Sequence, residues 1–79
     1  MFLIKRSEAI TVFHDLVQIN NEIAFSQIVE INKLSDTDEF ELKIKVVLDV
    51  HDVKPINEFL EKRSLKMREK DEFIIISSV

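Results

Sequence analysis

The 79-residue chain contains no glycine and no cysteine, and each absence excludes a class of site. Glycine provides the positive φ angles and the close backbone approach that phosphate loops require, so Walker and dinucleotide-binding loops are excluded. Without cysteine there is no disulfide framework, no thiolate ligand and no thiolate nucleophile. A chain this short therefore depends on core packing, or on a partner, for its stability.

Tyrosine and tryptophan are also absent, and the net charge of −4 argues against a general polyanion binder, which needs a basic surface. The apolar runs are much shorter than the roughly 20 residues of a membrane span. Lys5 and Arg6 follow the first apolar residues, the reverse of the order in a signal peptide. We therefore expect a single domain, 1–79, located in the cytoplasm and without a membrane span.

Strict alternation of apolar and mostly charged residues marks the segment 40–50. The apolar positions are Phe40, Leu42, Ile44, Val46, Leu48 and Val50. This period of two predicts a strand with one buried face. The segment 23–34 also favours a strand, with a bulge near Gln27 or Ile28 where its alternation slips. Because a polar turn at 35–38 separates the two segments, we expect them to form an antiparallel hairpin.

The segment 8–20 predicts the first helix, with Ser7 as its N-cap and an asparagine at its end. Its apolar residues form a broad helical stripe, in which positions 10, 13 and 17 have the expected spacing: Ile10, Val12, Phe13, Leu16, Val17 and Ile19. A β conformation is the competing interpretation, because the first half of this segment is rich in residues that favour strands.

The second helix is expected to be capped by Asp52, with Pro55 in its first turn, where the missing N–H matters little. We expect this helix to break near Ser64 and to be followed by a short strand at 65–68. The alternative is a helix that continues to Lys70.

Apolar segments at 2–5 and 72–79 predict the first and last strands. The order strand, helix, strand, strand, helix, strand predicts an α+β fold, the ferredoxin-like plait (βαββαβ). Its four-stranded antiparallel sheet would carry two helices on one face, with 65–68 as a possible extra strand. Strands 2–5 and 40–50 would be central, and strands 23–34 and 72–79 would be edges.

This order of elements resembles that of small regulatory plaits such as the ACT and NIL domains, over nearly the whole chain. The resemblance implies pairing of domains and binding of a small effector. The chain departs from those families where they usually carry glycine, because Arg6, Ser7 and Ser64 occupy those places. No binding residue is carried over from the resemblance.

The first and last strands are apolar on both faces, although only one face can meet the helices. The surplus would form an exposed apolar patch, which monomers seldom leave uncovered. We therefore expect a non-enzymatic interaction or regulatory module that forms a homodimer or docks on a partner protein through its outer sheet face or edge strands. The candidate interface residues are Phe2, Ile4, Val47, Ile74 and Ile76.

A basic run at 62–70 supports a different hypothesis, binding of nucleic acid. Its candidate anion-binding residues are Lys62, Arg63, Lys66, Arg68 and Lys70. The competing interpretation is a solvated helix end, whose dipole favours basic residues. An RNA-recognition sheet also needs aromatic residues on its open face, and strand 40–50 would present charged residues there, so we expect no stacking on that strand.

His51 lies close to Asp49 and Asp52, which suggests a metal site or an acid–base pair. The spacing matches no established ligand pattern, and we expect Asp52 to serve as a helix cap instead. No serine lies in a glycine-flanked nucleophile turn. We therefore expect no catalytic residue, no metal site and no cofactor.

Overall fold

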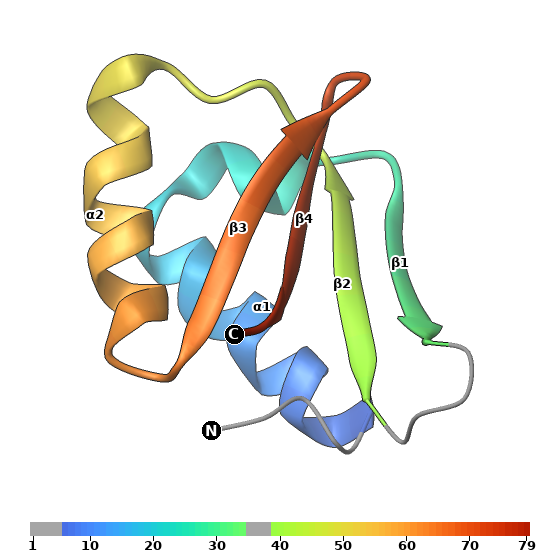
Figure 1. The fold of residues 1–79 in the computed structure, drawn as a ribbon. Coiled ribbons are helices and arrows are strands. Elements are labelled where there is room, and N and C mark those ends of the chain that lie inside the picture. The colour runs from blue at the N-terminus through green and yellow to red at the C-terminus, as the bar shows by residue number, and fades with distance from the viewer. Residues whose placement is uncertain (1–5, 35–38) are drawn as a thin grey trace.

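The computed structural model describes residues 6–34 and 39–79 (Figure 1). Within these ranges the chain forms two α-helices, one short 3-10 helix and four strands. In chain order they are α1 (Arg6–Ile19), η1 (Asn21–Phe25), β1 (Val29–Lys33), β2 (Phe40–Lys45), α2 (Val50–Glu61), β3 (Leu65–Lys70) and β4 (Phe73–Ser78). The predicted α+β class is confirmed, and so is the break after the second helix, which is followed by a strand slightly longer than expected.

The four strands form one antiparallel sheet in the order β1-β2-β4-β3. The predicted hairpin between β1 and β2 is confirmed, and β2 is central as expected. The prediction that the last strand lies at an edge is wrong, because a two-residue turn folds β4 back against β3 and places it between β3 and β2. A strand that is apolar on both faces suits this central position.

This strand order is not that of the ferredoxin-like plait, and the predicted first strand, 2–5, lies outside the described residues. The resemblance to ACT and NIL domains depended on the plait topology, so the observed sheet does not support it. Because β2 and β3 are both antiparallel to β4, they are parallel to each other, and α2 makes the connection between them.

The core lies between one face of the sheet and the two helices, which pack on the same side (Figure 1). Residues from both helices, η1 and three strands form one buried cluster. Its members are Val12, Leu16, Ile23, Leu42, Ile44, Leu48, Ile56, Leu60, Leu65, Ile74 and Ile76. The period-2 pattern of β2 thus places Leu42 and Ile44 in the core, as predicted.

Helix α1 turns part of the predicted broad stripe to the core: Val12 and Leu16 are at its centre, and Phe13 and Val17 are partly buried against it. Ala9, Val12 and Leu16 are its buried residues, whereas Ile10 is 43% exposed. The asparagine after the helix, Asn20, is extended rather than left-handed, and its side chain accepts a hydrogen bond from the N–H of Glu22 (2.9 Å). It therefore caps η1, which replaces the first part of the predicted strand 23–34.

The predicted strand 40–50 is also too long: β2 ends at Lys45, and residues 46–49 connect it to α2, which begins at Val50. Asp49, rather than Asp52, is the N-cap, and its carboxylate accepts a hydrogen bond from the N–H of His51 (3.4 Å). Pro55 consequently lies in the second turn, where it removes one intrahelical hydrogen bond. Val50, the last apolar residue of the predicted alternation, therefore belongs to α2 and not to the strand.

Among the residues that the structure describes, three adopt positive φ angles, in a chain that has no glycine for such positions: Ser64 (57°), Asp71 (52°) and Glu72 (67°). Asp71 and Glu72 are the two central residues of the turn between β3 and β4, since Lys70 pairs directly with Phe73. Two consecutive positive φ angles in a two-residue hairpin loop are typical of a type I′ turn, which normally carries Asn-Gly. A left-handed conformation costs an L-residue about 1–2 kcal/mol.

We therefore expect Glu72→Gly to raise the free energy of unfolding by about 1 kcal/mol, as measured by urea denaturation, because it removes this steric cost. Glu58→Gly, on the exposed side of α2, is the matched control and should lower the free energy of unfolding by about 1 kcal/mol. Equal destabilisation by the two substitutions would contradict the assigned turn.

Candidate functional site

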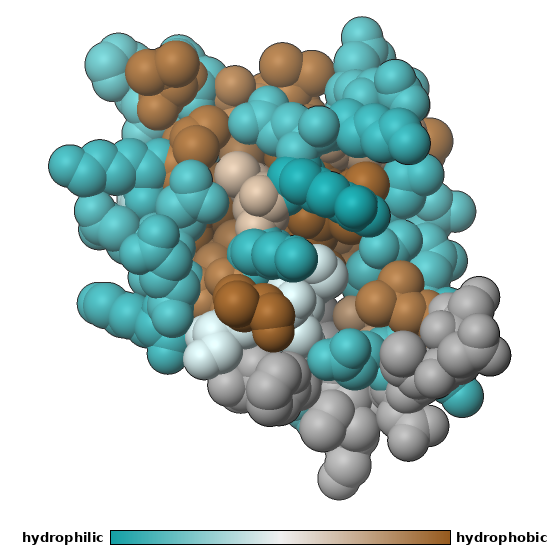
Figure 2. Space-filling model, in the orientation of Figure 1, coloured by the Kyte–Doolittle hydropathy of each residue, from teal (hydrophilic) through white to brown (hydrophobic). Residues whose placement is uncertain are grey.

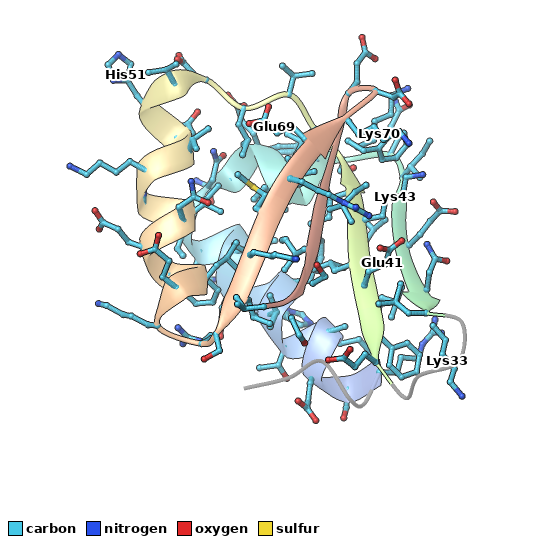
Figure 3. The ribbon with its side chains drawn as sticks, in the orientation of Figure 1. Lys33, Glu41, Lys43, His51, Glu69 and Lys70 are labelled. Carbon is cyan, nitrogen blue, oxygen red and sulfur yellow. The ribbon has the colours of Figure 1, made fainter. Side chains whose placement is uncertain are left out.

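The face of the sheet opposite the helices carries a concentration of basic side chains, and we call it the basic face. The strand pairings place Glu30 beside Lys43, Ile75 beside Arg68, and Phe73 beside Lys45 and Lys70. Its members are Glu30, Asn32, Glu41, Lys43, Lys45, Lys66, Arg68, Lys70, Phe73, Ile75 and Ser77. Figure 3 shows Glu41, Lys43 and Lys70 on the side of the sheet away from α2, and Glu69 on the other side.

Charge is distributed unevenly between this face and the remainder of the chain. The basic face holds five of the 11 lysines and arginines and only two carboxylates, although the whole chain has a net charge of −4. Neighbouring like charges on a sheet are unfavourable unless a ligand or opposite charges neutralise them. The basic face therefore provides a local positive field that the net charge conceals.

The basic face has apolar residues on a central strand, because two of the three outward residues of β4 are Phe73 and Ile75. The Nζ atom of Lys43 lies 4.5 Å from the centroid of the Phe73 ring, a cation–π contact. Ile75 is only 6% exposed although it belongs to the open face, because Lys43 and Arg68 flank it on either side. Figure 2 shows hydrophilic side chains extending across hydrophobic ones in this region, over β3 and β4.

Arg68 is positioned by a carboxylate from the next strand but one. Its Nη2 atom lies 3.4 Å from Oε2 of Glu41, and the arginine side chain is 64% exposed whereas that of the glutamate is 18% exposed. An exposed pair of this kind contributes at most about 1 kcal/mol to stability. Since this bond uses one of the five N–H donors of the guanidinium, the others remain available to a ligand.

These side chains surround a depression of about 350 Å³. Its lining consists of Glu41, Lys43, Arg68, Lys70, Asp71, Phe73 and Ile75. The volume is at the lower end of the range for small-ligand pockets, about 300–1,000 Å³. Three basic side chains beside an aromatic ring provide the chemistry to bind a phosphate next to a flat, apolar group.

The structure divides the predicted basic run 62–70 into two parts. Lys66, Arg68 and Lys70 alternate along β3 and belong to the basic face. Lys62 is instead the C-cap of α2. The lysines of β2 and the phenylalanine of β4 were not predicted as site residues, because only the sheet order brings them next to β3.

Arg63, the other member of the run, lies with the helices. Its guanidinium carbon is 3.9 Å from the centroid of the Phe59 ring, and its Nη2 atom is 3.9 Å from Oδ2 of Asp15. Its Nη1 atom also donates a hydrogen bond to the carbonyl oxygen of Phe59 (3.3 Å). We therefore assign Arg63 to the packing of α2 against α1 rather than to a ligand site.

The predicted interface residues on β4 are on the wrong side of the sheet. Ile74 and Ile76 are 0% exposed and belong to the core, so they cannot contact a partner of the folded domain. A shift of one residue exchanges the two faces of a strand, which explains the error. Val47 is 67% exposed, as expected, and Phe2 and Ile4 lie outside the described residues.

The two histidines are exposed and lie on different helices. The His14 ring meets that of Phe13 edge-on at 6.2 Å, and the backbone N–H of His51 donates to the capping Asp49. Within residues 6–34 and 39–79, no group of three His, Cys, Asp or Glu side chains is arranged to hold a metal ion. The structure thus gives Asp49 a capping role and leaves Asp52 in the first turn of α2.

No protein-family model, curated protein or solved structure matches the chain. Among the described residues, neither helix has the length and apolar character needed to cross a membrane.

Proposed function

We propose that the protein is a non-enzymatic binding module whose basic face binds single-stranded nucleic acid. The observation that carries the proposal is the convergence of Lys43, Arg68 and Lys70 around Phe73 on an open sheet face. The basic side chains would contact phosphates, which supply most of the affinity for nucleic acids. The phenylalanine ring would stack on a base, an interaction available only where bases are unpaired.

Single strands fit this surface better than duplexes because of the position of the aromatic ring. Phe73 lies on a central strand, between Lys45 and Lys70 on its neighbours, so a base on the ring would have cations on both sides. A stacked base would replace the Lys43 ammonium over the ring, and that ammonium would then be free to pair with a phosphate. A duplex hides its base faces and could use only the charges.

The test is the binding of fluorescently labelled oligonucleotides of about 12 nucleotides at low salt, followed by anisotropy. We expect Phe73→Leu to weaken binding about fivefold or more, because stacking on an aromatic residue contributes about 1–3 kcal/mol per base. Leucine keeps the apolar contacts of this half-buried position, and the thermal unfolding of the variant shows whether the fold is retained. A folded Phe73→Leu variant with unchanged affinity would contradict stacking on this ring.

Two lysines of the basic run provide a matched pair for the location of the site. Lys66→Gln removes a charge from the basic face and should weaken binding, whereas Lys62→Gln removes one from the C-cap of α2 and should not. Equal effects would indicate binding without a defined surface. Comparable affinity for free nucleotides would favour a small effector, and comparable affinity for an acidic peptide would favour a protein partner.

A further inference from the structure

A second surface, at the end of β2, exposes two large apolar side chains. Phe25 is 83% exposed and Val47 is 67% exposed, and both border a shallow depression of about 390 Å³. We call this surface the end patch. Its lining consists of Glu22, Phe25, Ser26, Gln27, Lys45, Val46 and Val47. A phenylalanine side chain is seldom this exposed, because burial of its large apolar ring is favourable.

The Phe25 ring projects from a backbone that is fixed on both sides. Before it, η1 is capped by Asn20 and anchored by Ile23, which is 0% exposed. After it, the Ser26 hydroxyl donates a hydrogen bond to the carbonyl oxygen of Lys45 (2.8 Å), and the Ser26 N–H donates to the carbonyl oxygen of Ile23 (3.2 Å). An exposed anchor on an ordered backbone loses little conformational entropy when a partner covers it.

We propose that the end patch binds a second copy of this chain in a two-fold symmetric dimer. A projecting ring and a depression lie side by side on the same surface. In an isologous interface each ring can therefore enter the depression of the other copy. Two further apolar residues at the start of β1, Ile28 (38% exposed) and Val29 (40% exposed), enlarge the apolar area around the ring.

The charges at the rim support a second copy as the occupant. Glu22 and Lys45 border the same depression and have opposite signs, so a two-fold axis can place the glutamate of each copy against the lysine of the other. Two molecules with a net charge of −4 repel each other at long range, and contacts of this kind offset the repulsion locally. A nucleic acid would gain nothing from Glu22. Burial of additional apolar surface also stabilises a domain of this size.

Sedimentation equilibrium without nucleic acid tests the dimer. We expect the unmodified chain to show a monomer–dimer equilibrium, and Phe25→Asp to raise its dissociation constant at least about 30-fold, as truncation of a hot-spot residue does. Val79→Asp is the matched control, because it places the same charge at another exposed valine (75% exposed) and should leave the equilibrium unchanged.

A charge exchange separates this dimer from non-specific association. Glu22→Lys and Lys45→Glu should each weaken the dimer, because like charges then face each other, and the double variant should restore it. A strictly monomeric protein at the highest attainable concentration would overturn the proposal. A dimer that withstands Phe25→Asp would overturn it as well. Either result would leave the proposed binding of nucleic acid to the basic face untouched, since Phe25 is not part of that face, and Lys45, which belongs to both surfaces, is varied here only in the absence of nucleic acid.

Discussion

Replacing Ile74 with lysine is expected to unfold the protein, whereas the same replacement at Val79 is expected to leave its stability nearly unchanged. Ile74 is 0% exposed on a central strand, between Ile44 and Glu69 of the neighbouring strands. Ile74→Lys removes its apolar contacts and places an ammonium among the aliphatic side chains of the core, with only the exposed Glu69 beside it, a change that can cost more than about 4 kcal/mol. A domain of this length has a total stability of only about 4–12 kcal/mol.

Circular dichroism and urea denaturation measure this effect, and Val79→Lys serves as the control because this side chain is 75% exposed and lies outside the end patch. Surface substitutions of that kind usually change stability by no more than about 0.5 kcal/mol. A well-folded Ile74→Lys variant with normal stability would show that β4 presents its other face to the helices. The assignment of Phe73 and Ile75 to the basic face would then be wrong.

The affinity for single-stranded nucleic acid is expected to fall about 100-fold between about 50 and 200 mM salt, if all five basic side chains of the basic face contact phosphates. Each contact with a single strand contributes about −0.7 to the slope of log affinity against log salt concentration, which gives a slope of about −3.5. This large dependence would arise in a chain of net charge −4 because the contacts are local.

Titrations at several salt concentrations measure the slope, and the two lysine variants calibrate it. Lys66→Gln should reduce the magnitude of the slope by about 0.7, whereas Lys62→Gln should leave it unchanged. A slope near zero would mean that the basic side chains do not pair with phosphates. A slope that the two variants change equally would mean that the whole basic run 62–70 acts together and the sheet face has no special role.

Local sequence signals predicted the elements whose stability depends mainly on neighbours in the chain. The alternation around Leu42 and Ile44 predicted a strand with one buried face, and the polar turn at 35–38 predicted its hairpin with β1. The break near Ser64 was also predictable, and the structure gives Ser64 a positive φ angle there. The N-cap of α2 was less predictable, because Asp49 and Asp52 can both cap a helix. The sequence alone does not select between them, and the structure has Asp49 as the cap.

The candidate site depends on which residues of β4 face outward, and no local sequence pattern indicates this. Phe73, Ile74, Ile75 and Ile76 are apolar without alternation, so the sequence left open which of them face the helices. The turn at Asp71 and Glu72 decides the question, because it pairs β4 with β3, whose own alternation is clear. A prediction that paired the two strands through this turn would have found Phe73 beside Lys70.

By itself, the sequence determined that the chain has no phosphate loop, no thiol chemistry and no glycine for its tight turns, and that its apolar residues exceed what two helices can cover. Only the tertiary structure decided where the excess lies. Hydrogen bonding between strands fixes the parity of β4 and turns its isoleucines at 74 and 76 inward, and the Ser26 contacts with β2 hold the Phe25 ring outward. Charge and apolar content are properties of composition, whereas their division into a basic face and an end patch is set by contacts between residues distant in the chain.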